Sequence, residues 1–329
     1  MTAETIETTQ NAVRGSARSG KRRPQIIPAL LTVAVITAMA AASELLNDPE
    51  IIFPEIAALA VGYLCAPKRS WQVTSARMFL LIAGCALLGL LISLYFPGYL
   101  YAKVLFAFVI AQVIFLFSGT SLAPLISAVV LPVLIGTKVI SYLISAAAMT
   151  ALIIALRHLL VRQGYRREEP FTAVARPGKA RWSSMFIRTA VAAVLLAPAV
   201  FAGWRYIAAP PLLVAFTELS ENWKPESPLK PWRVIALLTG GALIGAGTRF
   251  LLTMTLGLPL TLSAAVAASL ILAVLYRTRL FMPPAGAITI LAMLIPEGAV
   301  ALYPLQAGLG ICVYMFASVL MEMQRRIGN

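Results

Sequence analysis

Twelve apolar runs, separated by short polar segments, fill the sequence between residues 26 and 322. The chain is 60% hydrophobic, and its mean hydropathy is +0.86. Only 12% of its residues are charged, whereas a soluble domain carries about 25%. Runs of roughly 20 apolar residues match the hydrocarbon thickness of a bilayer. The sequence therefore predicts an all-α polytopic membrane protein whose main partner is the lipid bilayer.

The runs form two groups of six. They cover 26–45, 51–66, 77–96, 100–117, 121–136 and 138–160, and then 185–204, 206–219, 233–254, 257–276, 281–296 and 299–322. The second and fifth runs of each group fall at or below the roughly 17 residues that a spanning helix needs, and each contains proline, which breaks a helix. We expect these four runs to be discontinuous or tilted helices, with re-entrant loops as the alternative.

The positions of lysine and arginine predict the orientation. If the N-terminus is cytoplasmic and every run crosses, only Lys103, Lys138, Arg205 and Arg249 fall outside, and the other basic residues fall inside. Cytoplasmic loops carry the excess of basic residues in membrane proteins. The net charge of +14 therefore reflects topology, and we expect no nucleic-acid partner. Twelve crossings with both termini cytoplasmic, in a bacterial inner membrane, is the consistent solution.

The two groups of runs resemble each other. Trp71 and Trp232 each precede a glycine-bearing run, and the proline-containing segments 121–128 and 280–287 also correspond, with a spacing of about 160 residues in both comparisons. Six crossings separate equivalent runs, so the repeats share one orientation, which predicts an axis along the membrane normal. We expect four regions: a disordered basic tail (1–25), a first repeat (26–160), a basic cytoplasmic linker (161–183) and a second repeat (184–329).

A family resemblance rests on two motifs in the second repeat. Pro283-Pro284-Ala285-Gly286-Ala287, which follows Thr278-Arg279, resembles the signature of the HPP family of small integral membrane proteins, and Ser227-Pro228-Leu229-Lys230-Pro231 resembles the run that precedes the family's glycine-rich helix. The resemblance covers about residues 184–325. It implies a multi-span membrane protein, and some family members are linked to nitrite transport. Met282 replaces the family's histidine, so this position offers no side chain for binding a proton or a metal.

The starts of runs 5 and 11 predict an anion site. Helix N-termini favour anions because their backbone N–H groups are free and the helix dipole is positive there. Ordinary helix capping is the simpler explanation for the hydroxyl groups, and the role of a marker for an inside loop is the simpler explanation for the arginine. The candidate substrate-binding residues are Ser118, Thr120, Ser121 and Pro124 in the first repeat, and Thr278, Arg279, Met282, Pro283, Pro284 and Gly286 in the second.

Three charged residues are candidates for coupling or gating. Glu55 follows a proline in run 2 and is the candidate for proton coupling, while Lys138 and Glu297 lie at nearly equivalent outer positions with opposite charge. Ionisable groups inside membranes are costly and therefore mark functional sites. The alternative is that all three are interface residues without a function. An ion pair between Lys138 and Glu297 would form an outer gate.

The sequence favours a transporter over an enzyme. It contains one histidine, and it lacks a paired-histidine zinc motif, a GxSxG elbow and a phosphate-binding loop, so we expect no catalytic residues, metal or cofactor. Paired repeats with broken helices are a common transporter plan, and the family resemblance implies a small, nitrite-like anion as substrate. A non-transporting scaffold or sensor partner is the alternative. The spacing Gly241-x-x-x-Gly245 favours close packing within the chain over a homodimer interface.

Overall fold

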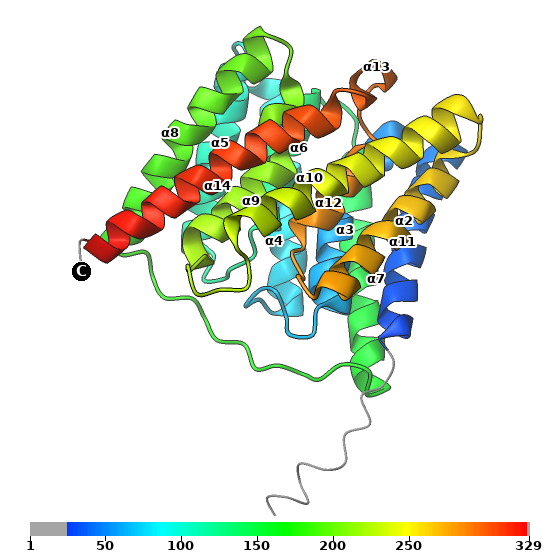
Figure 1. Cartoon of the computed structure of the whole chain (residues 1–329), viewed down its shortest axis with the longest axis horizontal. Coiled ribbons are helices and arrows are strands. Elements are labelled where there is room, and N and C mark those ends of the chain that lie inside the picture. The colour runs from blue at the N-terminus through cyan, green and yellow to red at the C-terminus, as the bar shows by residue number, and fades with distance from the viewer. Residues whose placement is uncertain (1–24, 328–329) are drawn as a thin grey trace, which may run out of the picture.

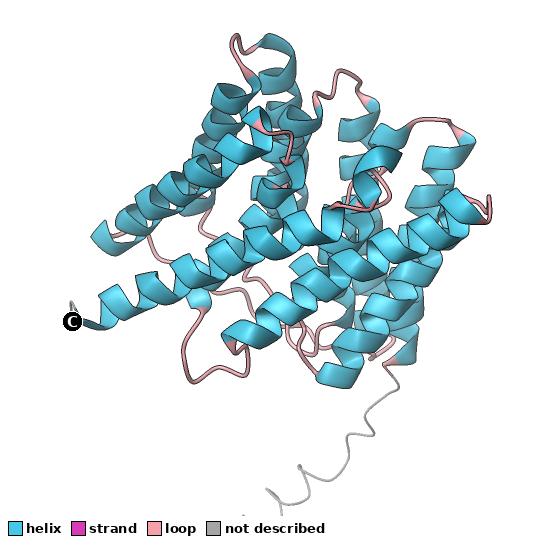
Figure 2. Cartoon of the chain, turned by 45° about the horizontal axis from the view of Figure 1, so that its top comes forward, coloured by secondary structure: helices cyan, strands magenta, loops and turns pink. Residues whose placement is uncertain are grey.

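The computed structural model describes residues 25–327, so residues 1–24 of the predicted tail lie outside the described part. The described chain is a bundle of helices (Figures 1 and 2). In chain order they are α2 (Ile26–Leu45), η1 (Pro49–Ile51), α3 (Glu55–Ala60), η2 (Val61–Cys65), α4 (Ser75–Tyr95), α5 (Leu100–Phe117), α6 (Pro124–Ile135), α7 (Ser141–Arg162), α8 (Lys179–Phe201), η3 (Arg205–Ala208), α9 (Pro210–Asn222), α10 (Pro231–Thr248), η4 (Arg249–Thr255), α11 (Leu260–Thr278), α12 (Pro284–Leu291), α13 (Glu297–Val300) and α14 (Tyr303–Ile327).

Eight of the helices within residues 25–327 are long and apolar enough to cross a membrane. They are α2, α4, α5, α7, α8, α10 with its continuation η4, α11 and α14. Each has 18 to 25 residues, which matches the length that a bilayer requires. The prediction of a helical membrane protein is therefore confirmed. The structure supports eight of the twelve predicted crossings by length and composition, and the other four predicted runs fold differently.

Those four runs form short helices in the interior of the bundle: α3 with η2, α6, α9 and α12. All residues of α3, η2 and α12 are buried, as are nearly all of α6 and α9. Each begins at a proline: Pro54 precedes α3, and Pro124, Pro210 and Pro284 open α6, α9 and α12. Proline suits a first helical position because the N–H it lacks has no partner within the helix there. The prolines therefore start these helices.

The long helices surround the short ones in matched contacts. Helix α2 packs along α11 and α5 along α8; α4 packs on α6 and α10 on α12. The short helices also meet one another, α3 against α12 and α6 against α9. Helices α3 and α12, and likewise α6 and α9, come from different predicted groups of six, so the interior of the bundle is built by both.

Two glycines allow the closest of these contacts. A Cβ atom on Gly89 of α4 would lie 2.4 Å from the Val129 carbonyl oxygen of α6, and one on Gly245 of α10 would lie 2.1 Å from the Thr289 carbonyl oxygen of α12. Neither distance is sterically allowed for a side chain. The close packing predicted around Gly245 is therefore confirmed, and its partner is a short interior helix of the same chain.

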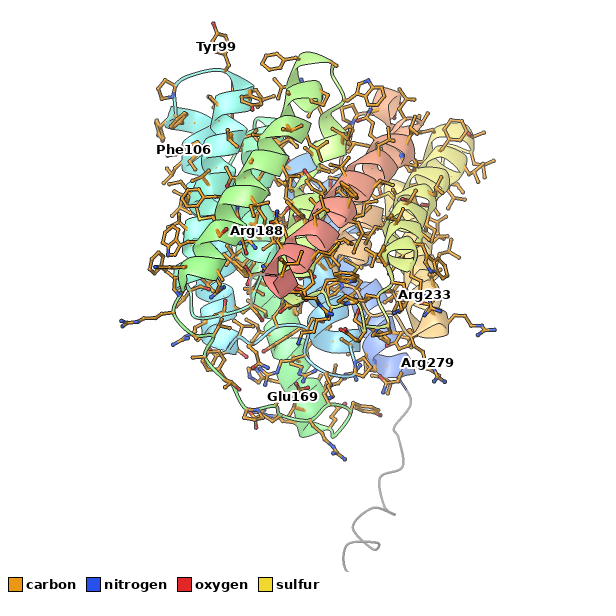
Figure 3. The ribbon with its side chains drawn as sticks, turned by 60° about the vertical axis from the view of Figure 1, so that its left-hand side comes forward. Tyr99, Phe106, Glu169, Arg188, Arg233 and Arg279 are labelled. Carbon is orange, nitrogen blue, oxygen red and sulfur yellow. The ribbon has the colours of Figure 1, made fainter. Side chains whose placement is uncertain are left out.

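The linker at 161–183 lies on the end of the bundle at which α2 begins, which we call the N-terminal face (Figure 1, lower edge). The Val174 N–H donates to the Gly119 carbonyl at 3.0 Å, and the Arg69 N–H donates to Glu169 Oε1 at 3.1 Å. Figure 3 shows Glu169 and Arg279 at this end and Tyr99 at the other, which we call the opposite face. The linker is thus held against the loops of the first group of helices.

Candidate functional site

A cavity of about 210 Å³ opens near the opposite face, between the two groups of helices. Its apolar walls are the C-terminal ends of α6 and α12, and its remaining wall consists of the segments that precede α3 and α9. The lining residues are Pro49, Glu50, Leu131, Leu134, Ile135, Arg205, Tyr206, Pro210, Leu291, Leu294, Ile295 and Pro296. Both groups therefore contribute equivalent elements to one small pocket, which we call the outer cavity.

Three polar side chains face this pocket. Glu50 comes from η1, and Arg205 and Tyr206 come from η3. Burial and the neighbouring Asp48 carboxylate raise the pKa of Glu50, and its Oε2 atom is buried without a hydrogen-bond partner in the described chain. The outer cavity thus holds an arginine and a carboxyl group on apolar walls. A small, charged or polar solute suits such a site.

Glu55, in the first turn of α3, is buried in the interior of the bundle with 1% of its surface exposed. Ser127 of α6 donates a hydrogen bond to Oε1, while Oε2 is buried and has no partner among the described residues. Electrostatic interactions connect the carboxyl group with Tyr142 and Tyr303. The structure therefore shows the predicted coupling residue enclosed by protein rather than exposed at an interface.

Tyr303 packs beside a residue that lines the outer cavity. Its ring packs edge-on against Tyr206, with the centroids 5.6 Å apart and the planes at 90°. Tyr206 lines the cavity, and the Tyr303 hydroxyl donates to the Ile288 carbonyl at 2.6 Å. The Tyr303 ring therefore stands behind a wall residue of the outer cavity and is tied to α12.

A second cavity, of about 510 Å³, lies at the N-terminal face. Tyr63 of η2, Arg69, Arg157 and His158 line it, together with residues 168–171 of the linker. Since Glu50 precedes α3 and Tyr63 lies in η2, the two cavities lie at opposite ends of the α3–η2 helix. Glu55 is in the first turn of this helix, about 12 Å from Tyr63 at 1.5 Å per residue.

The hydroxyl groups predicted to bind an anion at the start of α6 have partners within the protein. Ser118 Oγ donates to the Phe115 carbonyl at 2.9 Å and accepts from the Thr120 N–H at 3.1 Å. Ser121 Oγ accepts from the Gln72 N–H at 2.8 Å. These bonds shape the turn that leads to Pro124, and they do not cap α6, whose N-cap residue Ala123 makes no side-chain hydrogen bond.

The equivalent residues before α12 act similarly. Thr278 Oγ1 donates to the Val274 carbonyl at 2.7 Å. Arg279 is exposed and adopts a left-handed conformation with φ of 59° after the end of α11. Met282, by contrast, is buried with 3% exposed. The structure therefore does not bring these side chains together around one space.

The proline and glycine of the α12 motif are packing residues. A Cβ atom on Gly286 would lie 3.1 Å from the Ala57 carbonyl oxygen of α3, and one on Gly62 would lie 3.0 Å from Pro283 Cγ. Pro284 is buried and opens α12. The segment thus lets α12 approach α3 closely, as expected for small residues after a proline break.

The predicted gate of Lys138 and Glu297 does not form. Both side chains are exposed, and neither takes part in an ion pair within the described chain. Glu297 instead interacts electrostatically with Arg249. The Arg249 guanidinium donates to the Ala292 carbonyl at 2.6 Å, at the end of α12. It therefore compensates the negative end of that helix.

Two more arginines, Arg157 and Arg166, hold the end of the α3–η2 helix. Arg157 Nη1 donates to the Tyr63 carbonyl at 2.8 Å, and Arg166 donates to the Leu64 and Cys65 carbonyls at 2.6 and 2.7 Å. The last carbonyls of a helix have no partner within it and attract cations. Sequence reasoning used these arginines only as markers of topology, because their partners lie about 100 residues away in the chain.

Arg188 is a fully buried cation in α8 (Figure 3). Its Nε donates to Gln112 Oε1 at 2.5 Å, and its Nη1 donates to Glu221 Oε1 at 2.8 Å. A buried charge of this kind needs a paired and hydrogen-bonded partner. The network connects α5, α8 and the end of α9.

Sequence reasoning missed Glu218. This half-buried carboxyl group of α9 accepts a hydrogen bond from Trp71 Nε1 at 2.7 Å, across 147 positions of sequence. The Trp71 ring packs against Gly62. A carboxylate within the apolar run 206–219 was the available signal, because ionisable groups in membrane segments are rare.

Comparisons with models of protein families, with curated proteins and with solved structures find no match. The resemblance to the HPP family therefore stays a prediction from two sequence motifs.

Proposed function

We propose that this chain transports a small anion across a membrane and that Glu55 carries a proton in the same cycle. The observation that carries the proposal is the buried Glu55 carboxyl group, with one unpartnered oxygen, on the short helix that separates two cavities. An ionised carboxylate is costly in this environment, whereas its protonated form is tolerated. The group therefore responds to the arrival of a proton.

The outer cavity supports an anion as the substrate. Arg205 and Glu50 both face it, so protonation of Glu50 would leave the cavity with the positive charge of Arg205. A volume of about 210 Å³ suits a small solute. Together with the implication of the HPP resemblance, these features favour a nitrite-like anion. In the proposed cycle, the Tyr206–Tyr303 ring pair closes the outer cavity toward Glu55.

The proposal includes two six-helix repeats that cross the membrane twelve times. Matched hydrogen bonds support it: the Tyr142 hydroxyl of α7 donates to the Ala128 carbonyl at 3.1 Å, and the Tyr303 hydroxyl of α14 donates to the Ile288 carbonyl at 2.6 Å. In each case the bond joins a short helix to the long helix that follows it in the chain: α6 to α7, and α12 to α14. The close contacts of Gly89 and Gly245 correspond in the same way.

Contacts at the ends of α3 with η2, and before α9, support a crossing by these two elements. The segment before α3 bonds the start of α7, where Ser145 Oγ donates to the Ile51 carbonyl, and the end of η2 bonds Arg157 near the end of α7. Helix α3 with η2 therefore extends along the length of α7. In the second group, the Tyr206 N–H before α9 donates to Gln306 Oε1 near the start of α14 at 3.0 Å. Broken helices of this kind meet at substrate sites in transporters built from repeats.

We also propose that the N-terminal face is cytoplasmic and that the membrane is a bacterial inner membrane. The basic linker, the arginines at the end of α14 and Arg277 and Arg279 at the end of α11 all lie at this face. An excess of basic residues marks the cytoplasmic side.

A non-transporting scaffold is the second candidate, and one observation favours it. The hydroxyl groups at the starts of α6 and α12 are engaged in hydrogen bonds within the protein, so they serve the packing without any ligand. A scaffold would keep the same bundle but would not move solute.

The test is nitrite uptake into proteoliposomes, with and without an inward proton gradient. Wild type is compared with Glu55→Gln, with Ser127→Ala, which removes the hydrogen bond to Glu55, and with Pro284→Leu, which replaces the proline that opens α12. The exposed Glu297→Gln is the matched control, because it also removes one carboxylate. Orientation and insertion are measured for every variant.

We expect wild type and Glu297→Gln to take up nitrite faster in the gradient. Glu55→Gln should lose the gradient dependence, Ser127→Ala should shift it to a different pH, and Pro284→Leu should lose uptake. No uptake of nitrite or of other small anions by correctly inserted wild type would overturn transport in favour of the scaffold. Unchanged gradient dependence in Glu55→Gln would remove the proton from the proposal.

A further inference from the structure

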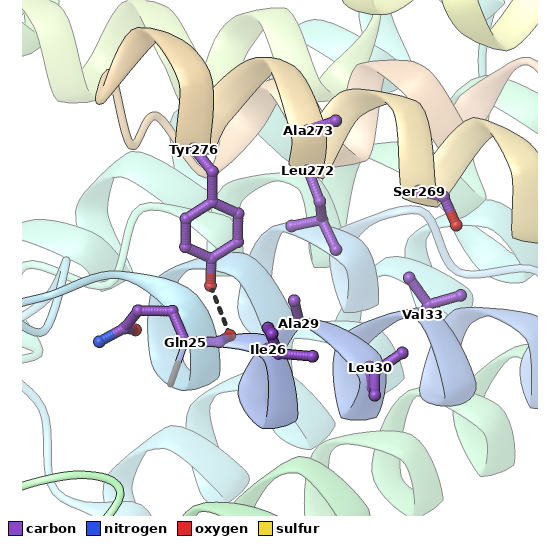
Figure 4. Close-up of a pocket in the computed structure, with 9 residues that line it drawn as sticks. All are labelled: Gln25, Ile26, Ala29, Leu30, Val33, Ser269, Leu272, Ala273 and Tyr276. Atoms are coloured by element: carbon purple, nitrogen blue, oxygen red, sulfur yellow. Dashed lines mark hydrogen bonds between the residues drawn. The ribbon is translucent and has the colours of Figure 1, made fainter. Parts of the chain in front are cut away.

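A groove of about 420 Å³ runs between α2 and α11 at the N-terminal face (Figure 4). On α2 it is lined by Ile26, Ala29, Leu30 and Val33, and on α11 by Ser269, Leu272, Ala273 and Tyr276. Each set follows the spacing i, i+3, i+4, i+7, which marks one face of a helix. The groove therefore extends along two turns of both helices, about 10 Å at 1.5 Å per residue.

Small side chains keep this groove open. Ala29, Ser269 and Ala273 contribute little volume, and the Ser269 hydroxyl is turned back to the Ala265 carbonyl of its own helix at 2.8 Å. The Tyr276 hydroxyl donates to the Gln25 carbonyl at 3.4 Å and bridges the two helices at the end of the groove. Leu30 and Ala273 are exposed. The walls are thus apolar and face the surroundings of the bundle.

The corresponding helix pair, α5 with α8, is filled instead. There Phe117 packs against Trp182 with centroids 5.9 Å apart, Trp182 packs against Phe186 at 6.4 Å, and the Tyr101 hydroxyl donates to the Ala193 carbonyl. An aromatic contact and a hydrogen bond therefore join these two helices. The groove at α2 and α11 is therefore a local feature of one helix pair.

Positive charge gathers at the end of the groove. Arg277 directly follows the lining residue Tyr276, and Arg279 follows two residues later; both side chains are exposed. Among the ion pairs of the described residues, none involves Arg277 or Arg279. In the sequence, Lys21, Arg22 and Arg23 come shortly before Gln25. Basic clusters beside membrane helices attract anionic lipid headgroups.

We propose that the groove binds an anionic phospholipid, with one acyl chain between α2 and α11 and the phosphate against Arg277 and Arg279. An acyl chain suits apolar walls that face a bilayer, and the uncompensated guanidinium groups suit a phosphate. This site is independent of the proposed transport, because none of its residues lines either of the two cavities described above.

The test uses the full chain in detergent, titrated with phosphatidylglycerol or with phosphatidylcholine of the same acyl chains. Native mass spectrometry counts bound lipid, and thermal unfolding gives the shift in Tm. Ala273→Trp fills the groove, and Ala190→Trp places the same ring on an exposed position of α8 as the control. A double variant, Arg277→Gln with Arg279→Gln, removes the positive charge at the end of the groove. Arg176→Gln, at an exposed position of the linker, is its control.

We expect wild type to retain one phosphatidylglycerol in preference to phosphatidylcholine and to gain several degrees in Tm. Ala273→Trp should lose both the retained phosphatidylglycerol and the rise in Tm. The arginine double variant should lose about tenfold of the preference for phosphatidylglycerol over phosphatidylcholine. Both controls should behave as wild type. Equal retention by Ala273→Trp and wild type would overturn the groove as the site. A dimer that Ala273→Trp abolishes would overturn the lipid in favour of a second copy of the chain.

Discussion

Gly245→Ala is the most direct test of how the interior helices are held. The new Cβ atom would lie 2.1 Å from the Thr289 carbonyl oxygen and 2.9 Å from Ala292 Cβ. Carbon and carbonyl oxygen approach to about 3.3 Å at closest in comparable helix contacts. Because the obstacles are backbone and a methyl group, no side-chain rotation relieves the clash. Helices α10 and α12 must therefore separate by about 1.2 Å at this point.

The expected change in the free energy of unfolding combines two opposed effects. Forcing an extra methyl group into a packed interior costs about 1–3 kcal/mol, and the backbone position of the clash favours the upper end. Replacing glycine by alanine in a helix returns about 1 kcal/mol. We expect Gly245→Ala to be destabilised by about 2 kcal/mol in total.

Gly247→Ala is the matched control on the same helix. No atom of a neighbouring segment lies within 4 Å of its Cβ position. Its free energy of unfolding should rise by up to about 1 kcal/mol from helix propensity alone. The two variants should therefore differ by about 3 kcal/mol, measured as free energies of unfolding in mixed micelles of mild detergent and dodecyl sulfate, followed by circular dichroism. If Gly245→Ala unfolds at the same dodecyl sulfate fraction as Gly247→Ala, the contact between α10 and α12 is not as close as described.

Three further variants test single polar contacts by the same unfolding assay. Glu44→Ala removes the carboxylate that accepts from the Thr261 N–H at 2.9 Å and caps α11, so we expect a loss of about 1 kcal/mol. Arg249→Met leaves the end of α12 without its cation and should lower the free energy of unfolding by about 1–3 kcal/mol. An unchanged free energy of unfolding would mean that the guanidinium contacts only water. Tyr303→Phe removes the hydrogen bond to the Ile288 carbonyl and should lose about 1 kcal/mol, which an unchanged midpoint would contradict.

The sequence was most informative where a residue type acts on its own backbone. Proline restricts its own φ angle and lacks an N–H, so the prolines marked the four short runs as broken or tilted, and those at 124 and 284 also indicated where two of the short helices begin. Apolar length similarly predicted the long helices. The sequence did not indicate that α3, α6, α9 and α12 would be buried on nearly every side, since apolar runs that face lipid and runs that face protein have the same composition.

The candidate site was harder to predict because its contacts join distant segments. Ser127 lies 72 positions from Glu55, and Trp71 lies 147 positions from Glu218. No spacing rule connects such pairs. The hydroxyl groups at 118–121 could be noticed because they act locally, and for the same reason they proved to be turn-forming residues. A charged residue inside an apolar run, as with Glu218, was the more reliable signal for the interior.

The two interior carboxyl groups also separate the two proposed functions. Glu55 lies in the first turn of α3, toward the opposite face, whereas Glu218 lies in the second half of α9, toward the N-terminal face. Each carboxyl group accepts one hydrogen bond that holds neighbouring segments together, from Ser127 to Glu55 and from Trp71 to Glu218, so packing accounts for part of each placement. A transport cycle uses groups that accept a proton at different depths. If the proposed transport holds, the Oε2 atom of Glu55, which has no partner among the described residues, distinguishes a proton-moving protein from a scaffold, because a scaffold needs only the hydrogen bonds that the two carboxyl groups already make.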